Sequence, residues 1–531
     1  MGFLDKFFGK REEIRKQTGT PSFNNLKKNM DYIKGKLKDC DDVIYRDIWV
    51  GEEQQYNLAL VFIDGLIDKD LINDHVMHSL LLDARQAEPN IEKIKGNLYE
   101  VIKKATITGG DIKEINDLDK CILSILSGDT ALLFDGSEKI VIISSKGWQT
   151  RSISPPETET VVRGSREGFT ETIRVNTALV RRWIRDPNLK IKQIQVGERS
   201  HTDVAVIYIE GIVNNKVLDV VLERINLIRI DGVIESGYIE QLIEEDWHSP
   251  FPQVLNTERP DRVAAALLEG KVAILTDNTP FALIVPATLT SLFQSPEDYY
   301  ERWMISSLLR ILRFLSAIIA LTAPAIYIAF TSYHPGLIPT KLTLYIAATR
   351  QGVPFPAFIE AFIMEATFEL LREAGIRLPM PIGQTIGIVG GLIIGQAAVQ
   401  AGIVSPLMVI VVAVTAVASF SIPSYSAAIS FRMLRFLFMI LAAMFGLYGI
   451  MLGFMILLTH LVVLKSFGVP YLSPFVEFDI SDISDTLIKA PIMYLKRRPE
   501  ILNTQDKKRM KDLRKEHMES IEDDRREKDD R

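Results

Sequence analysis

The sequence has 531 residues, more than one domain of roughly 100 to 200 residues usually contains, so about two to four structural units are expected. Hydrophobic residues make up 47% and charged residues 24% of the chain, and its formal net charge is -6. Because nucleic-acid binding depends on a basic surface that releases counterions, this charge predicts no nucleic-acid partner.

Residues 1–45 are predicted to form an N-terminal extension. Asp5, Lys6 and Lys10 interrupt the continuous apolar core that a signal peptide would need. The residues up to position 300 should therefore stay in the cytoplasm.

An internal repeat predicts that the following residues form two similar α/β lobes, 46–155 and 156–300. The repeat consists of two pairs of segments: Ala59–Asp68 with Ala205–Asn214, and Cys121–Asp135 with Val263–Asp277. Positions correspond at an offset of 146 residues in the first pair and 142 residues in the second. In the second pair, Gly128 and Gly270 each stand between a helical pattern and an apolar strand, where a helix C-cap favours glycine. We expect the same internal topology in both lobes.

Residues 301–466 are predicted to form an α-helical transmembrane domain. Only 10 of the 151 residues from Phe314 to Leu464 are Asp, Glu, Lys or Arg. Runs without these charges are long enough to cross the hydrocarbon layer of a membrane. They predict four spans: 314–332, 382–404, 407–430 and 436–464.

Two features of these spans predict how they pack. In the second span, glycines recur every fourth residue: Gly383, Gly387, Gly391 and Gly395. A helix face without side chains lets another backbone approach closely, either in a wall around a conduit or in ordinary helix association. Pro423 removes a backbone donor among several serines, which predicts a break in the third span.

A glutamate-bearing helix is predicted at 357–373, between the first two spans. Its acidic residues are Glu360, Glu365, Glu369 and Glu373. The last three fall within a stripe of about 80°. Ionisable groups at membrane depth usually face a cavity or pore, so these residues are candidates for lining a cation path. In the alternative, the helix lies at the membrane surface and its acids pair locally, Glu369 with Arg372 and Glu373 with Arg377.

Basic residues predict that both ends of the membrane domain are cytoplasmic. Arg302, Arg310 and Arg313 precede the first span, and the charged tail 467–531 carries Lys496–Arg498 after the last one. Both ends inside require an even number of crossings. Four spans satisfy this if the glutamate helix does not cross, whereas a fifth crossing would place the tail outside. The end of the tail predicts a solvated helix or disorder.

No motif predicts enzymatic chemistry. The P-loop, H-E-x-x-H and G-x-S-x-G patterns are absent from the sequence. The seven histidines are dispersed, and Cys40 and Cys121 form no C-x-x-C pair, which favours buried thiols. We therefore predict that the protein is not an enzyme and has no cofactor and no metal site.

Six segments share their pattern with one protein family. They are Val162–Gly164, Ser249–Asp261, Ser295–Trp303, Pro354–Gly375, Leu378–Gly387 and Gly390–Val399. In these segments the chain resembles the A subunits of GerA-type spore germinant receptors. The resemblance extends from about Asn57 to Pro474.

The resemblance implies a nutrient-sensing subunit in the inner membrane of a bacterial endospore, with its N-terminal lobes in the cytoplasm. It implies a homo-oligomer, expected to be a pentamer, that forms a ligand-gated cation channel surrounded by membrane lipid. A permease-like B subunit and a lipoprotein C subunit are the implied partners. Two alternatives stay open: a secondary transporter subunit, which would show inverted repeats in its membrane part, and the family member associated with the release of dipicolinic acid.

Overall fold

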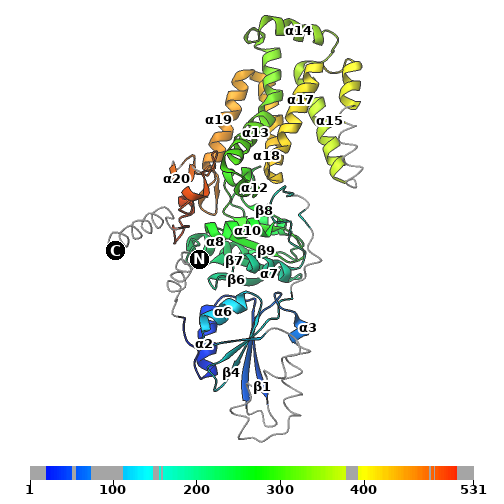
Figure 1. Cartoon of the computed structure of the whole chain (residues 1–531). Coiled ribbons are helices and arrows are strands. Elements are labelled where there is room, and N and C mark those ends of the chain that lie inside the picture. Colours follow the sequence, from blue (N-terminus) through cyan, green and yellow to red (C-terminus); the bar gives the residue numbers. More distant parts are fainter. Residues whose placement is uncertain are drawn as a thin grey trace, which may run out of the picture.

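The computed structural model describes residues 19–50, 56–72, 112–147, 155–156, 159–377, 391, 393–476, 480–483 and 485–510. Figure 1 shows two lobes, each with a sheet and helices, followed by a bundle of long helices. The second lobe lies between the first lobe and the bundle.

The first lobe contains a five-stranded antiparallel sheet with the strand order β1-β2-β4-β5-β3. Its strands are β1 (Val43–Val50), β2 (Tyr56–Ile63), β3 (Ile112–Ile115), β4 (Thr130–Phe134) and β5 (Ile140–Ile143). Its helices are α2 (Leu26–Lys36), α3 (Lys69–Leu71) and α6 (Leu118–Leu126).

The second lobe contains a five-stranded antiparallel sheet with the strand order β6-β7-β9-β10-β8. Its strands are β6 (Leu189–Val196), β7 (Thr202–Ile209), β8 (Leu255–Thr257), β9 (Val272–Thr276) and β10 (Ala282–Val285). Its helices are α7 (Ile173–Trp183), α8 (Asn215–Leu227), α9 (Ser236–Ile243), α10 (Pro260–Glu269), α11 (Leu289–Phe293) and α12 (Glu297–Tyr300).

The two sheets share their register as well as their strand order. Leu58 on β2 is opposite Phe134 on β4, and Val204 on β7 is opposite Thr276 on β9. The offsets of 146 and 142 residues read from the sequence map the first pair onto the second. Gly128 and Gly270, which follow α6 and α10, both have positive φ angles, of 90° and 99°.

The inner strands β4, β5, β9 and β10 are buried along their whole length, so both faces of the sheets are covered there. Along β2, Ala59, Val61 and Ile63 belong to the core beneath α2 and α6, whereas Leu58 and Leu60 belong to a second core on the opposite face. This alternation follows from the two-residue period of a strand.

The N-terminal boundary differs from the prediction, because residues 19–45 belong to the first lobe. Helix α2 packs a buried face of Leu26, Met30, Ile33 and Leu37 onto the sheet, and β1 begins at Val43. The spacing of these four residues is that of one helix face, a pattern that is present in the sequence. The predicted N-terminal extension, residues 1–45, therefore includes residues 19–45, which are part of the first lobe.

A buried ion pair joins the two lobes. Arg181 on α7 donates to both carboxylate oxygens of Asp42, at 2.8 and 2.9 Å, and both side chains are buried. Nearby, the Cys40 thiol points at the carbonyl of Leu189. Cys40 and Cys121 are both free and buried, as predicted. Burial raises the pKa of the Cys121 thiol to about 12, so it is not a reactive thiolate.

The bundle contains α13 (Trp303–Ser332), α14 (Thr340–Arg350), α15 (Ala357–Arg377), α17 (Pro406–Phe420), α18 (Tyr425–Phe445) and α19 (Leu447–Val463). Residues 393–400 are also helical. Among the described residues, α13 and α18 are long and apolar enough to cross a membrane, and α17 and α19 are shorter apolar helices.

The helices after residue 406 differ from the two predicted spans, 407–430 and 436–464. The structure has three helices there, and α18 contains Arg432 and Arg435, which lie between the two predicted spans. Each arginine pairs with a glutamate of α15, so the bundle accommodates its charge. The chain leaves helical conformation at 421–424, where Pro423 lies, and again at Gly446.

The second lobe and the bundle share one continuous apolar core. At their junction, the ring of Phe251 lies 5.7 Å from that of Phe431 on α18, and Phe293 stacks on Phe314 of α13 at 4.4 Å. The Ser249 hydroxyl bonds to the ring of His460 on α19 at 2.8 Å. These contacts fasten the lobe to the ends of three helices.

The described part of the predicted tail, 467–531, contacts the second lobe. The Gln505 side chain donates to the carbonyl of Val213 at 2.9 Å, and Arg498 donates to the carbonyl of Leu268 at 2.9 Å. Leu502 is buried against the second lobe. The described part of this segment therefore lies at the lobe end of the bundle. The predicted disorder of the last residues falls on 511–531, outside the described residues.

Candidate functional site: the glutamate helix

Helix α15 runs along the bundle and does not lie across its end (Figure 1). Its contacts with α17 occur at Ser405, the N-cap of that helix, and at Ser419, near its C-terminus. Its 21 residues span about 31 Å at 1.5 Å per residue, enough to cross a hydrocarbon layer. The four-span topology, in which this helix does not cross the membrane, stays a prediction.

The stripe of glutamates begins on the buried face of α15. Ala357, Glu360, Ala361, Met364 and Glu365 are all buried, at the i, i+3, i+4 spacing of one helix face. Glu360 is fully buried and accepts a hydrogen bond from the backbone N–H of Ser405 at 2.5 Å. That N–H lies at the start of α17, where the helix dipole stabilises a carboxylate.

One helical turn further on, Glu365 forms an ion pair with Arg435 of α18. The two side chains are 1% and 2% exposed. The second carboxylate oxygen of Glu365 and two guanidinium nitrogens of Arg435 have no hydrogen-bond partner in the protein. This pair therefore cannot be satisfied by its direct contact alone, and the remaining polar atoms lie in the interior of the bundle.

Glu369 lies between two arginines at the lobe end of the bundle. One carboxylate oxygen is 3.3 Å from Arg372, and the other is 3.1 Å from Arg432 on α18. The Glu369 side chain is 29% exposed, so it is the first acid of the stripe that solvent can reach.

Glu373, the last acid of the stripe, is more than half exposed and pairs with Arg377 at 2.6 Å. This pair and the pair between Glu369 and Arg372 are the two local contacts that the surface-helix alternative predicted. The structure thus contains the local pairs of one hypothesis and the bundle-depth helix of the other.

Glu360 and Glu365 are buried in this structure and do not face solvent. Both face the interior of their own subunit, where a backbone N–H and Arg435 hold them. The sequence reasoning considered only partners on the same helix and so missed Arg432 and Arg435. A signal was present, because these arginines stand three residues apart in an otherwise apolar segment and would need buried counter-charges.

The glycine stripe is described only in part, since Gly383 and Gly387 lie outside the described residues. A Cβ atom on Gly391 would be 3.3 Å from the ring of Phe368 on α15, and one on Gly395 would be 3.1 Å from Val409 on α17. These two glycines therefore allow close contacts within the chain itself.

Among the residues that the structure describes, no group of three or more His, Cys, Asp or Glu side chains could hold a metal ion. The cluster is instead a row of carboxylates opposed by arginines and by the N-terminus of α17. Such a row in an apolar bundle defines a helical protein with a polar interior, attached to a pair of α/β lobes.

Comparisons with known proteins agree with this class. A family model described as the Bacillus/Clostridium GerA spore germination protein matches residues 31–501. The chain belongs to this GerA family of spore germination proteins.

Individual relatives are similar over nearly the whole chain. Spore germination protein KA of Bacillus subtilis is 45% identical over 93% of this chain and 89% of its own length. Spore germination protein GerLA of Bacillus cereus is 46% identical over 91% of this chain and 96% of its own length. The crystal structure of the N-terminal domain of the A subunit of the Bacillus megaterium spore germinant receptor GerK3 matches with 35% identity and a TM-score of 0.41, over 51% of this chain and 99% of that domain.

Proposed function

We propose that the protein is the A subunit of a spore germinant receptor and forms a ligand-gated cation channel by oligomerising as a pentamer. Membership of the GerA family supports the role in germination. The observation that carries the channel is the depth of α15, which places four carboxylates from one end of the bundle to the other. Ionisable groups at such depth cost free energy and are rare, and those that occur usually mark an ion path or a switch.

In this proposal the structure corresponds to a closed state. Arg435 neutralises Glu365, and Arg372 and Arg432 neutralise Glu369, so little negative potential is left to attract a cation. Opening would move α15 away from α18 and free these carboxylates. The exposed acids Glu369 and Glu373 would line the path at the lobe end, whereas Glu360 and Glu365 would do so only after the movement.

The outer face of α15 supports an oligomer. Phe362 is 41% exposed and Leu370 is 72% exposed, and both are apolar. A neighbouring subunit or lipid would cover them. We place the protein in the spore inner membrane with its lobes and the C-terminal segment in the cytoplasm, together with B and C subunits, and we assign it no catalytic activity.

We also propose that the two lobes arose by internal duplication. The equal strand order and the register at the same offsets support this origin. Two similar lobes beneath one bundle would give the receptor a stiff platform that transmits motion to α13 and α18.

Potassium flux through proteoliposomes that contain the receptor subunits tests the channel. Glu369→Gln and Glu373→Gln should each lower the germinant-dependent flux, because each substitution removes one carboxylate per subunit from the path. Glu198→Gln, which neutralises an exposed acid of the second lobe, should leave the flux unchanged. An unaltered flux in the Glu369→Gln/Glu373→Gln double variant would exclude α15 from the path.

A further inference from the structure

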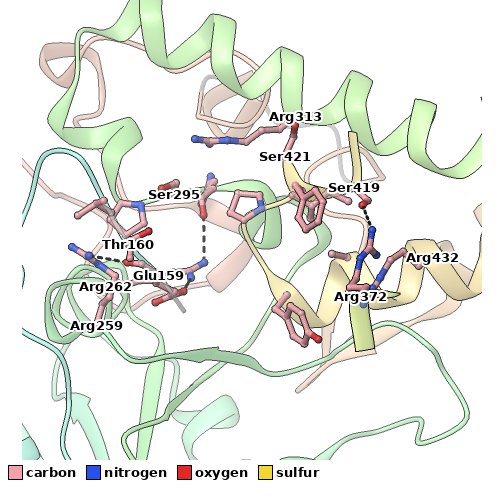
Figure 2. Close-up of a pocket in the computed structure, with 18 residues that line it drawn as sticks. Glu159, Thr160, Arg259, Arg262, Ser295, Arg313, Arg372, Ser419, Ser421 and Arg432 are labelled. Atoms are coloured by element: carbon pink, nitrogen blue, oxygen red, sulfur yellow. Dashed lines mark hydrogen bonds and ion pairs between the residues drawn. The ribbon is translucent and has the colours of Figure 1, made fainter. Parts of the chain in front are cut away.

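A cavity of about 420 Å³ lies where the second lobe meets the bundle. Figure 2 shows residues of the lobe on one side, including Arg259, Arg262 and Glu159, and Arg372 and Arg432 of the bundle on the other. The non-helical turn around Pro423 forms part of its wall. The cavity thus touches both parts of the molecule at the end of the membrane helices.

The lining is rich in arginine. Five arginines line it, from α10 and its N-cap and from α13, α15 and α18: Arg259, Arg262, Arg313, Arg372 and Arg432. Among the lining residues the only carboxylate is that of Glu159, which pairs with Arg262. Positive groups therefore outnumber negative groups on the cavity wall.

The arginines on the lobe side and on α13 are paired with carboxylates, one of which, Asp298, also binds Arg310. Asp261 binds Arg259 through two hydrogen bonds, of 2.7 and 3.0 Å. Asp298 binds Arg313 at 2.8 Å. These contacts fix the two guanidinium groups in place and balance much of their charge.

Arg372 and Arg432 lack such a balance, because they share a single carboxylate, that of Glu369. The Arg432 side chain is only 11% exposed, and its Nε atom is buried without a hydrogen-bond partner in the protein. Arg372 donates to the Ser419 hydroxyl at 3.1 Å (Figure 2), a neutral acceptor. The two guanidinium groups carry two positive charges and Glu369 carries one negative charge. One further anion in the cavity would therefore balance the pair.

We propose that this cavity binds a phosphate group. A tetrahedral phosphate accepts hydrogen bonds in several directions, which suits arginines that approach from α15 and α18 on one side and from α10 on the other. The hydroxyl of Ser421, which also lines the cavity, supplies a further donor. Tyr425, the first residue of α18, also lines the cavity, so the positive end of that helix dipole adds to the attraction.

Either an acidic phospholipid headgroup or a free phosphate could supply this group. The cavity lies at the end of apolar helices, at the level of a membrane surface, and it is open to solvent as well. A bound phosphate would balance the charge of Arg372 on α15 and Arg432 on α18 at the wall of this cavity. The phosphate proposal does not require that α15 lines a cation path, but the proposed opening would separate Arg372 on α15 from Arg432 on α18.

Equilibrium dialysis of the detergent-purified full chain against radiolabelled inorganic phosphate tests the site. We expect one phosphate per chain. Arg372→Gln and Arg432→Gln should each weaken binding about tenfold or more, the effect of losing a hydrogen bond between charged groups. Glu369→Gln and Glu159→Gln should strengthen binding, since each removes a competing carboxylate. Arg377→Gln is the matched control, because Arg377 is on the same helix but does not line the cavity.

A second arm uses native mass spectrometry of the chain in nanodiscs of phosphatidylcholine with phosphatidylglycerol. Retained phosphatidylglycerol that Arg372→Gln and Arg432→Gln release, without phosphate binding in dialysis, would identify a lipid headgroup as the source. Phosphate binding in dialysis would identify free phosphate. If neither is bound, or if Arg432→Gln and Glu369→Gln change binding in the same direction, the site does not exist. A folding defect alone would not give opposite signs for arginine and carboxylate variants.

Discussion

The carboxylate of Glu365 on α15 contacts the guanidinium of Arg435 on α18, and both side chains are buried within the bundle. The two residues are 70 positions apart in the sequence. Each charge is stable in this interior only because the other is present, since an isolated buried ion loses its hydration without compensation. The pair therefore fixes α15 against α18.

Removing one member of this pair should destabilise the bundle strongly. We expect Glu365→Gln or Arg435→Gln alone to cost on the order of 3 to 5 kcal/mol of folding free energy, because each leaves an unpaired buried charge. The double variant should recover most of this loss. Thermal unfolding of the purified full chain, arranged as a double-mutant cycle, measures the coupling. Additive losses would show that the two side chains do not interact.

A close backbone contact between α18 and α19 makes Gly449 sensitive to any side chain. A Cβ atom at this position would lie 2.0 Å from the carbonyl oxygen of Leu441, which belongs to the backbone and cannot rotate away. Gly449→Ala should therefore cost on the order of 3 kcal/mol through overpacking. Gly336→Ala is the control, because a Cβ there meets nothing within 4 Å. Equal yields of folded protein from the two variants would contradict the helix pairing.

Glu240 on α9 should make the second lobe less stable at high pH. Burial raises the pKa of this carboxyl to about 7 from an ordinary 4.5, and the neighbouring Glu244 and Glu235 add to the effect. The folded state thus holds its proton where the unfolded state has lost it. Stability falls as pH rises through the window between these two values, and the loss is complete above about pH 7.

We therefore expect Glu240→Gln to raise the melting temperature at pH 8 and to change it little at pH 5. Tryptophan fluorescence of the full chain follows the unfolding, with Trp247 close to the end of α9. A stabilisation of the same size at both pH values would mean that removal of the charge is not its cause.

The sequence was sufficient where the structure depends on local patterns. The strand pairings follow the repeat offsets, and the pairs between Glu369 and Arg372 and between Glu373 and Arg377 follow helical spacing. It was insufficient where distant segments meet. Nothing next to Arg435 in the sequence identifies Glu365 as its partner, and this omission placed the boundary of a predicted span inside α18.

The C-terminal segment gives a second example of the same limit. Solvated helix or disorder is predicted from Gln505 onward, and just before it Leu502 is buried and Arg498 bonds to a carbonyl of the second lobe, as Gln505 itself does. Hydrogen bonds to backbone carbonyls leave no pattern in the sequence. The position of this segment could be found only from the folded chain.

Chemical modification of a cysteine at position 369 tests most directly whether α15 lines a cation path. The native cysteines are buried, so a small cationic thiol reagent should reach only an introduced thiol. We predict that Glu369→Cys reacts from the aqueous side in receptor proteoliposomes and that the reaction lowers potassium flux. Leu370→Cys, one residue away on the exposed apolar face, should react slowly and leave the flux unchanged. Equal reactivity at both positions, or full modification of Glu369→Cys without loss of flux, would contradict the account.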